Sequence, residues 1–465
     1  MATRIKPVAS SPAPAPVDEP ATFLRAHPDV ETVDAFVVDH NGIARGKRLP
    51  ASAIVKIYEN GLFLPRSVHA LDIWGRDVAD AGMALQSGDG DGLCVPVPGS
   101  LKRVTWAERP AAQLLLQMLG HDGRPFAADP RSVLKRVVDR LAELGLTAVA
   151  ACELEFYLLE RNRPTGQPPR PACSPRTGRP PASPNVYSLD ELDSFAELFR
   201  EITEAAKVQE IPCDTILTEH GPSQFEINLW HQPDALRAAD CAVLFKRLIK
   251  GIARRHGLEA TFMAKPFGEF AGNGMHVHVS LLDRGGRNPL DDGGSGAPEL
   301  RHAVGGLLAT MPQIMPMLAP NPNSFRRLRP NSYAPTTPTW GYENRSVSIR
   351  IPQAGGPARR LEHRVAGADA DPRLVLAAIL AGVHHGIVNR IEPPPESVGN
   401  AYEQSTRILP PSLADALDEF ERSPFVQQYF GAEFCKVFAA CKWQELDTHT
   451  DTVPVSEHEA YLTAL

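Results

Sequence analysis

Five segments of the chain alternate polar or charged residues with apolar ones, which is the period-2 pattern of a β-strand. The polar positions are Glu153 and Glu155; Gln224, Glu226 and Asn228; His276, His278 and Ser280; Ser348 and Arg350; and Arg360, Glu362 and Arg364. A single strand of this kind usually turns its polar face to water. Because these faces carry Glu, His and Arg but no Lys, we expect the five strands to share one functional site.

The residue types on these faces indicate what the site binds. Carboxylates and imidazoles suit a hard divalent cation, and the planar fork of Arg suits phosphate and carboxylate groups. Together they predict a site that holds Mg²⁺ or Mn²⁺ against an anionic, phosphorylated substrate.

The rest of the pattern predicts two domains behind a tail. Residues 1–23 are rich in Ala, Pro and Ser, and we expect them to form a disordered tail. Residues 24–122 mix short strands with turns and predict a small α+β domain. An amphipathic helix that begins at Asp129 opens a second domain over residues 128–465. Within it, residues 162–184 are rich in Pro and predict an excursion loop.

Length, composition and charge narrow the class of protein. A chain of 465 residues is too long for one ordinary core. Its net charge of -7 argues against a nucleic-acid or anionic-membrane partner. The longest apolar run, Leu374 to Val383, is about half of a membrane span and predicts a buried helix. Seven cysteines without a CxxC pair, and an N-terminus without an apolar signal-peptide core, favour the cytoplasm.

Four ordered motifs resemble those of the glutamine synthetase family. They are CELEFY at residues 152–157, GNGMHVH at 272–278, NRSVSIRIP at 344–352 and RLEHR at 360–364. The resemblance covers nearly the whole chain. It implies an α+β fold with an N-terminal β-grasp domain and a C-terminal catalytic domain, whose curved antiparallel sheet is flanked by helices. It also implies a two-ringed homododecamer with active sites between subunits.

Carried over position by position, the resemblance implies a role for each charged group. The expected ligands of a first metal ion are Glu155, Glu219 and Glu226, and those of a second are Glu153, His276 and Glu362. The residues expected around ATP are Arg345, Arg350, Arg360, His278 and Ser280, with His278 nearer the nucleotide than the metal. The residues expected around glutamate are Arg327, Arg364, Gly272 and His276. In the implied reaction the γ-carboxylate of glutamate takes the terminal phosphoryl group of ATP, and an amine then displaces phosphate.

The chain departs from the family where ammonium binds. The family carries a glutamate in a flap, in a Gly-Tyr-Glu-Ala-Pro segment, whereas NSYAP at residues 331–335 places Tyr333 there. A Tyr offers no carboxylate near neutral pH, but its ring can line a passage for an alkyl chain and attract an ammonium group. The family's Asp-Gly-Ser-Ser motif is likewise reduced to LDIWG at residues 71–75, where Asp72 is a candidate contact for the amine.

These departures resemble the branch of the family that joins glutamate to polyamines such as putrescine, or to ethanolamine. We therefore expect an ATP-dependent ligase that uses glutamate and a primary amine, with Arg327, Arg345, Tyr333 and Asp72 among its catalytic residues. The alternatives are a glutamine synthetase that uses ammonia and a non-catalytic structural oligomer. Tyr402 lies near a tyrosine that some bacterial members adenylylate, but its neighbours match poorly, and we expect an exposed residue without a role.

Overall fold

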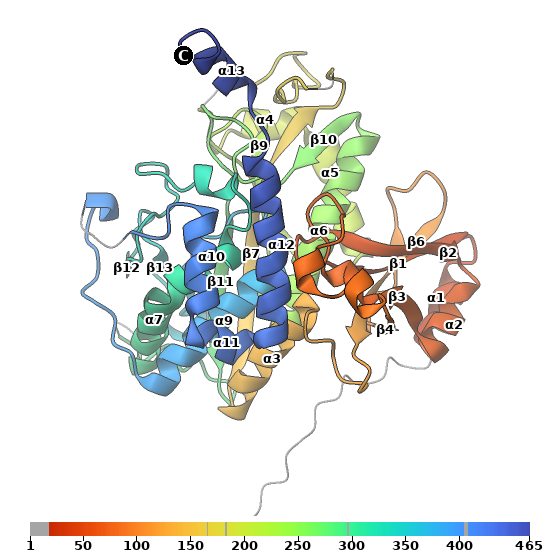
Figure 1. The fold of residues 1–465 in the computed structure, drawn as a ribbon, viewed down its shortest axis with the longest axis horizontal. Helices are drawn as coiled ribbons and strands as arrows, with labels where there is room; N and C mark the ends of the chain where they lie inside the picture. The colour runs from red at the N-terminus through yellow and green to blue at the C-terminus, as the bar shows by residue number, and fades with distance from the viewer. Residues whose placement is uncertain (1–17, 165, 182–183, 295–296, 404–407) are drawn as a thin grey trace, which may run out of the picture.

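The computed structural model describes residues 18–164, 166–181, 184–294, 297–403 and 408–465 (Figure 1). Two β-sheets organise the described chain, one in each expected domain, with helices packed against them. The predicted α+β class is therefore confirmed.

The N-terminal sheet has six strands in the order β2-β1-β6-β4-β3, with β5 paired to β6. Its strands are β1 (Thr32–Val38), β2 (Ala44–Pro50), β3 (Leu62–Pro65), β4 (Asp91–Pro96), β5 (Lys102–Val104) and β6 (Ala111–Leu119). Strand β1 pairs antiparallel with β2 and parallel with β6. The β1–β2 turn is closed by the Asp39 carboxylate, which accepts hydrogen bonds from the backbone N–H groups of Asn41 and Ile43.

Two helices, α1 (Glu19–Ala26) and α2 (Ala53–Asn60), belong to this domain. Phe23 of α1 and Ile54 and Ile57 of α2 enter the core of the N-terminal domain. The expected tail over residues 1–23 is therefore wrong for its last residues, because a short helix buries Phe23 there. The remainder of that segment, residues 1–17, lies outside the described residues.

The catalytic sheet has eight strands in the order β12-β13-β14-β11-β7-β9-β8, with β10 paired to β7. Its strands are β7 (Thr147–Glu160), β8 (Cys213–Thr218), β9 (Gln224–Leu229), β10 (Leu258–Thr261), β11 (Met275–Leu282), β12 (Trp340–Tyr342), β13 (Ile349–Ile351) and β14 (Leu361–His363). All of its pairings are antiparallel except β12 with β13. The five polar-faced segments lie in this one sheet, as their common pattern predicts.

The catalytic domain carries most of the helices. They are α3 (Pro130–Glu143), α4 (Leu189–Ser194), α5 (Ala196–Val208), α6 (Ala235–Arg255), α7 (Pro298–Thr310), α8 (Met315–Leu318), α9 (Pro372–Asn389), α10 (Leu413–Arg422), α11 (Pro424–Phe430), α12 (Ala432–Thr450) and α13 (Val455–Tyr461). Helix α3 begins where the sequence predicts, because the Asp129 side chain caps the N–H of Arg131 and Pro130 follows it. Helices α3, α6 and α9 share one apolar core with the inward side chains of β7. The polar face of the sheet is thereby left free to form a site.

Helix α9 contains the longest apolar run of the sequence. Among the described helices it alone is long and apolar enough to cross a membrane, and 78% of it is buried inside the fold. Its first turn is capped by the Asp371 carboxylate. The prediction of a buried core helix is confirmed.

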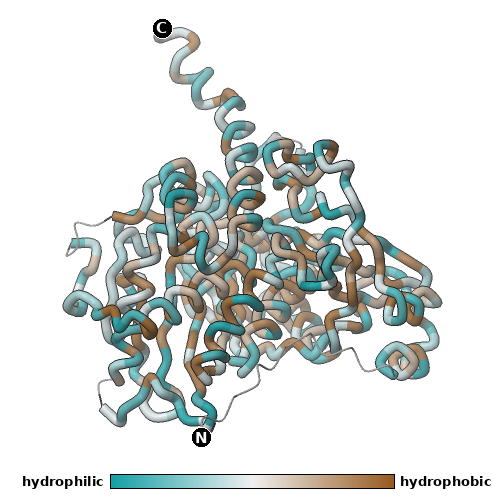
Figure 2. The backbone as a smooth tube through the Cα atoms, turned by 60° about the horizontal axis from the view of Figure 1, so that its bottom comes forward, coloured by the Kyte–Doolittle hydropathy of each residue, from teal (hydrophilic) through white to brown (hydrophobic). Residues whose placement is uncertain are grey.

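Helix α12, near the C-terminus, packs against both domains. Val437 and Cys441 of α12 belong to the core of the N-terminal domain, and α12 stands beside that domain in Figure 1. The buried Lys442 ammonium pairs with Glu445 and also donates to Asn41 in the β1–β2 turn. The N-terminal core is therefore completed by residues from the end of the chain. Beyond α12, helix α13 extends away from the body (Figure 2).

Residues 162–184 leave the catalytic sheet after β7, as expected of an excursion loop. The described part returns to the sheet, because Ala172 is buried and its carbonyl oxygen accepts a hydrogen bond from Ser223 Oγ, 2.7 Å away. Residues 165, 182 and 183 lie outside the described part of the chain.

Candidate active site

A cavity of about 910 Å³ opens over the polar face of the catalytic sheet. Its charged lining residues are Glu153, Glu155, Glu219, Glu226, Glu362, His276, Arg327, Arg345, Arg350 and Arg364, with Lys265 and Glu269 near Phe270. Strands β7, β9, β11, β13 and β14 and the segments between elements supply these groups. A volume of this order suits a substrate of small-molecule size.

Strand register places the acids opposite one another. On β7, Glu153 faces His276 of β11, and Glu155 faces Glu226 of β9. Directly opposed positions on an antiparallel pair bring side chains within contact distance. The alternation seen in the sequence therefore becomes a compact cluster across three neighbouring strands.

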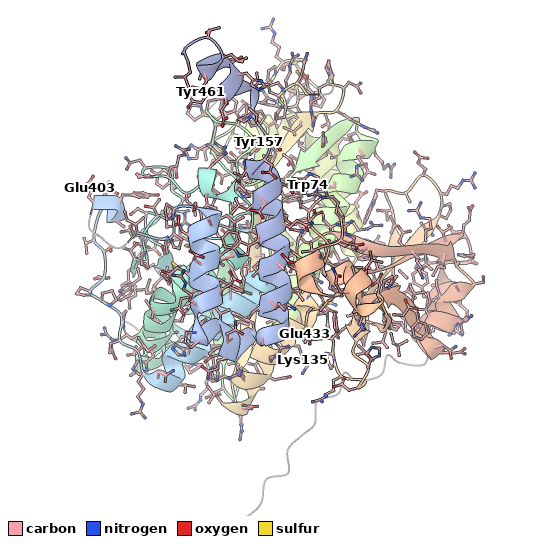
Figure 3. All side chains as sticks on the ribbon, in the orientation of Figure 1. Trp74, Lys135, Tyr157, Glu403, Glu433 and Tyr461 are labelled. Atoms are coloured by element: carbon pink, nitrogen blue, oxygen red, sulfur yellow. The ribbon has the colours of Figure 1, made fainter. Side chains whose placement is uncertain are left out.

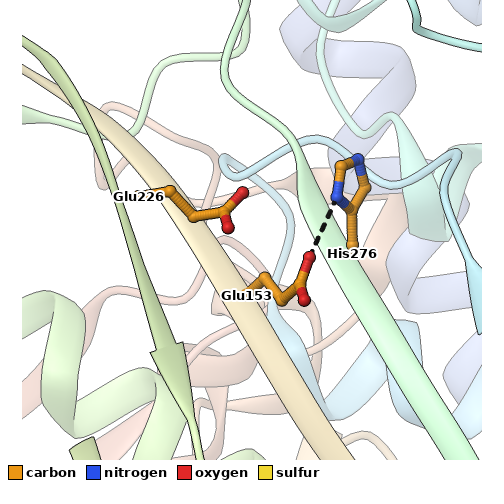
Figure 4. A group of neighbouring side chains, drawn as sticks. All are labelled: Glu153, Glu226 and His276. Atoms are coloured by element: carbon orange, nitrogen blue, oxygen red, sulfur yellow. Dashed lines mark hydrogen bonds and ion pairs between the residues drawn. The ribbon is translucent and has the colours of Figure 1, made fainter. Parts of the chain in front are cut away.

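Three sets of donors lie close enough together to hold a metal ion. They are Glu155, Glu219 and Glu226; Glu153, Glu226 and His276; and Glu153, His278 and Glu362. Within each set the donor atoms lie within 4.8 Å of one another. Figure 4 shows Glu153, Glu226 and His276 converging, with His276 Nδ1 3.2 Å from Glu153 Oε2. The first set coincides with the donors expected for a first metal ion.

The donors expected for a second ion also lie near one another, with His278 beside them. His276 Nδ1 lies 3.2 Å from Glu153 but 3.7 Å from Glu362 Oε1. His278, expected nearer the nucleotide than the metal, instead places Nε2 2.8 Å from Glu153 Oε1. Because His276 and His278 are two residues apart on β11, they share one face and both reach Glu153.

The acids of this cluster have strongly shifted pKa values. Burial, followed by the neighbouring carboxylates, raises the pKa of Glu226 well above its usual range. Burial and Glu155 raise the pKa of Glu219 to about 8. Burial also opposes ionisation of Glu153, but the hydrogen bonds with His276 and His278 outweigh it, so the pKa of Glu153 lies well below its usual range.

These shifts test whether the residues fit a metal. Several buried carboxylates close together repel one another, and a divalent cation is the partner that lets all of them ionise. Donor sets that consist mainly of carboxylate oxygens suit Mg²⁺ or Mn²⁺. The donor set therefore fits the divalent cations that the sequence predicts.

The arginines occupy two depths in the cavity. Arg327 is buried, and its guanidinium donates to the Val365 carbonyl oxygen at 2.8 Å. Arg364 is also buried and pairs closely with Glu362. Nearer the opening, Arg350 Nη1 donates to Glu362 Oε2 at 2.8 Å, and Arg345 is exposed. A row of cations thus runs from the floor of the cavity to its mouth.

Two glycines admit Arg327 to the floor. A Cβ on Gly272 would lie 2.5 Å from the Ala264 carbonyl oxygen and 2.9 Å from Arg327 Cγ. A Cβ on Gly274 would lie 2.5 Å from Arg327 Nη2. Gly272 also lines the cavity, as expected. Its missing side chain makes room for the arginine as well as for a ligand.

Three residues expected around the nucleotide lie beyond the cavity lining. Arg360 Nε donates to His278 Nδ1 at 3.2 Å, and Ser280 Oγ donates to the Arg359 carbonyl oxygen at 3.0 Å. They continue along β11 and β14 from the donor cluster. The structure therefore connects Arg360 to the donors through His278 and gives Ser280 a backbone partner.

The flap places its aromatic residue at the cavity mouth. Tyr333 lines the cavity and is 60% exposed. Its φ of 56° lies in the left-handed region, which costs a residue other than Gly about 1–2 kcal/mol. Its ring stacks on His220, at 6.3 Å between centroids. No carboxylate occurs in the flap segment, residues 331–335.

Sequence reasoning missed several residues of the mouth. Val186, Tyr187 and His220 line it from loops that precede α4 or follow β8. Loop residues carry no periodic signal, so only the fold could place them. Tyr402 was expected to be exposed and without a role. It is instead half-buried, and its hydroxyl donates to the Ala334 carbonyl oxygen in the flap at 3.0 Å.

Asp72 does not join this cavity within the chain. It is fully buried, and its carboxylate accepts hydrogen bonds from the backbone of Trp74 and from the side chains of Arg76 and Gln444. Both carboxylate oxygens of Asp72 thus accept hydrogen bonds that close the loop over residues 72–76 and attach this loop to α12. Within the chain Asp72 thus has a structural role, and its contact with the amine stays a prediction, while Trp74 beside it is 55% exposed next to α12 (Figure 3).

Comparison with known proteins agrees with this fold. A family model for the glutamine synthetase catalytic domain matches residues 127–461. The chain is 44% identical to gamma-glutamylputrescine synthetase PuuA of Escherichia coli (strain K12), over 91% of this chain and 90% of that protein. It is 33% identical to a glutamate–isopropylamine ligase of a Pseudomonas species, over 95% and 96%. A solved structure of GmaS with ADP superposes with a TM-score of 0.83 at 28% identity, covering 96% and 99%.

The fold and its donor cluster thus define a class, that of ATP-dependent ligases that activate a carboxylate. Within that class the chain belongs to the glutamine synthetase family. Its activity is that of a glutamate–amine ligase.

Proposed function

We propose that the amine substrate is a primary amine with an alkyl chain, of which putrescine is the type. The proposal rests mainly on Tyr333. This residue puts an aromatic ring at the cavity mouth, where the family carries a carboxylate for ammonium. A ring face attracts an alkylammonium group and packs against its methylene groups. The relative named for putrescine, at 44% identity over most of both chains, supports the same substrate class.

The arginines divide the work of binding. Arg327 and Arg364 lie on the floor, where they suit the carboxylates of glutamate. Arg345 and Arg350 lie nearer the mouth, where they suit the phosphates of ATP. A γ-carboxylate oxygen of glutamate attacks the terminal phosphorus of ATP and ADP leaves. The amine nitrogen then attacks the acyl carbon of γ-glutamyl phosphate, phosphate leaves, and the nitrogen loses a proton to give the γ-glutamyl amide.

Two divalent cations per site, Mg²⁺ or Mn²⁺, belong to this proposal. The donors that would hold them are Glu155, Glu219 and Glu226 for one, and Glu153, His276 and Glu362 with His278 for the other. When bound, such ions supply positive charge that lowers the repulsion between carboxylate and polyphosphate.

Ammonia is the second candidate amine. Glutamine synthetases are among the relatives, for example that of Pyrococcus abyssi at 32% identity. The flap argues against ammonia, because Tyr333 and its neighbours offer no carboxylate to a small cation. Convergence of the metal donors argues against a purely structural oligomer, which has no need of them.

The assembly and its location complete the proposal. We take the protein to be a homododecamer in the cytoplasm. Exposed apolar side chains on the N-terminal domain, such as Phe63 and Trp74, support contact with further copies. Seven cysteines that are all free support a reducing compartment.

Phosphate release tests the proposed activity. ATP, Mg²⁺ and glutamate are supplied with putrescine, spermidine, ethanolamine or ammonium in turn, at equal concentrations. Release is expected with the alkylamines and to be weak with ammonium. Release with ammonium alone would overturn the alkylamine proposal, and no release with any amine, with metal shown to be bound, would favour a structural role.

A further inference from the structure

The flap over the cavity mouth is held in an uncommon backbone conformation. Asn331 and Tyr333 have φ values of 61° and 56°, both in the left-handed region. Residues other than Gly persist there only when surrounding contacts hold them. The contacts on this flap therefore show what keeps Tyr333 in place.

The first contact is with the side chain of Tyr333. Its ring lies nearly parallel to the imidazole of His220, with 17° between the planes and 6.3 Å between the centroids. His220 directly follows Glu219, and its backbone N–H donates to the Glu219 carboxylate at 3.3 Å. The imidazole that stacks on Tyr333 thus belongs to the residue directly after a metal donor.

The second contact is with the flap backbone. Tyr402 Oη donates to the Ala334 carbonyl oxygen at 3.0 Å, one residue after Tyr333. Tyr402 is half-buried and lies 68 positions further along the chain. Ser332 Oγ adds a local bond to the Arg329 carbonyl oxygen at 2.6 Å. The flap is therefore held through its ring by His220 and through its backbone by Tyr402.

The Tyr333 ring, stacked on His220, presents a flat, polarisable face at the mouth. Such a surface packs against methylene groups and attracts a cation over its face within about 6 Å. Ammonium has no methylene groups to pack, whereas an unbranched alkylamine has several. An unfixed Tyr333 would lose this surface without any change in the metal donors.

We infer that His220 and Tyr402 are positioning residues of the amine site, which hold Tyr333 as a wall for an alkylamine. This inference rests on the proposed function for the identity of the substrate. The positioning itself is a separate property of the flap and can be measured without turnover.

The test compares His220→Ala, His220→Phe and Tyr402→Phe in the full chain. Loss of an aromatic pair contact should raise the KM for putrescine about 2- to 12-fold in His220→Ala, with the KM values for glutamate and ATP unchanged. His220→Phe restores a ring and should return the KM for putrescine towards the wild-type value. Tyr402→Phe should raise it as well, because Phe cannot donate a hydrogen bond.

A second readout needs no activity. Hydrogen exchange of the flap peptide over residues 331–335 should be faster in His220→Ala and Tyr402→Phe than in the wild type. The matched controls are His231→Ala and Tyr461→Phe, since both residues are exposed and lie outside the cavity lining. Neither control should change flap exchange or the KM for putrescine.

Several results would overturn the inference. They are unchanged flap exchange in both variants, an equal rise in all three KM values, or no recovery in His220→Phe. If the wild type accepts only ammonium, the proposed function fails. Faster flap exchange in His220→Ala and Tyr402→Phe would then still support the positioning role, and unchanged exchange would overturn it as well.

Discussion

Glu153 and His276 face one another across β7 and β11, with 3.2 Å between Glu153 Oε2 and His276 Nδ1. Glu153 links the two metal-donor groups, because it also lies within reach of Glu226 of the first group and of His278. One glutamate at the centre of the sheet thus connects the acidic half of the cluster to the histidine half. The phosphoryl-transfer part of the site is therefore built on rigid strands, whereas the amine part is built on loops.

Glu226→Gln tests whether the acidic cluster binds a divalent cation. The substitution replaces a buried carboxyl group whose ionisation is opposed by burial and by four other glutamates. Without added metal the variant should be at least as stable as the wild type. With Mn²⁺ at about 100 times its Kd, the wild type should gain about 2.7 kcal/mol and the variant clearly less. Phosphate release should fall about 100-fold or more.

Thermal unfolding with and without a chelator measures both effects. Equal stabilisation of wild type and Glu226→Gln by Mn²⁺ would remove Glu226 from the metal site. Lower stability of the variant in the chelator would contradict the repulsion among the acids.

Asp72→Ala tests the structural role assigned to Asp72. The change leaves Arg76 and Gln444 without their shared acceptor at a buried position. The free energy of unfolding should fall by about 1–3 kcal/mol. Asp80→Ala, a change at an exposed residue nearby, should alter it by less than about 0.5 kcal/mol. An Asp72→Ala protein of wild-type stability whose KM for the amine has risen would instead restore Asp72 as a substrate contact.

His69 predicts a loss of stability in acid. Burial lowers the pKa of His69 from 6.5 to about 3. The charge of Arg373 also lowers this pKa, and that of Asp371 partly opposes the decrease. Neither ring nitrogen has a hydrogen-bond partner among the described residues. Between these two pKa values, His69 therefore binds a proton in the unfolded chain but not in the folded chain. Stability is complete above pH 6.5 and decreases as the pH falls from there towards 3.

At about pH 5 this histidine should cost about 2 kcal/mol. His40, whose pKa burial lowers to about 3 as well, adds a similar loss. His69→Phe should therefore lose less stability than the wild type between about pH 7.5 and pH 5 in thermal unfolding. The exposed His231→Ala should follow the wild type. An unchanged acid slope in His69→Phe would show that His69 is protonated or solvated in the folded state.

Tyr333→Glu tests the identity of the amine. A carboxylate in the flap would attract a small cation and remove the ring that packs on methylene groups. The ratio of kcat/KM for ammonium to that for putrescine should rise about 10-fold or more. Tyr333→Phe is the matched control and should keep the ratio near that of the wild type. If the glutamate variant leaves the ratio unchanged, Tyr333 does not determine the amine.

The sequence predicted those parts of the site that regular strands carry. Glu153, Glu155 and Glu226 converge because alternation fixes which face of a strand a residue occupies, and one sheet then brings the faces together. The start of α3 followed from its Asp-Pro cap. Family resemblance was needed to assign roles to Glu219 and Arg327, which lie outside the periodic segments.

What the sequence could not predict depends on contacts between distant loops. His220 stacks on Tyr333, and Tyr402 holds Ala334, across long stretches of chain. The sequence does not show that Asp72 is already hydrogen-bonded, because its partner Gln444 comes from a helix near the C-terminus. Pairings of this kind carry no local pattern, because only the packing of whole elements creates them.

The products formed when two amines compete show most directly which amine the enzyme uses. The wild-type enzyme is given ATP, Mg²⁺ and glutamate with equal concentrations of putrescine and ammonium, and the products are separated by mass spectrometry. We predict that γ-glutamylputrescine accumulates and that glutamine is a minor product. Glutamine as the main product would contradict the proposal that the amine substrate is an alkylamine.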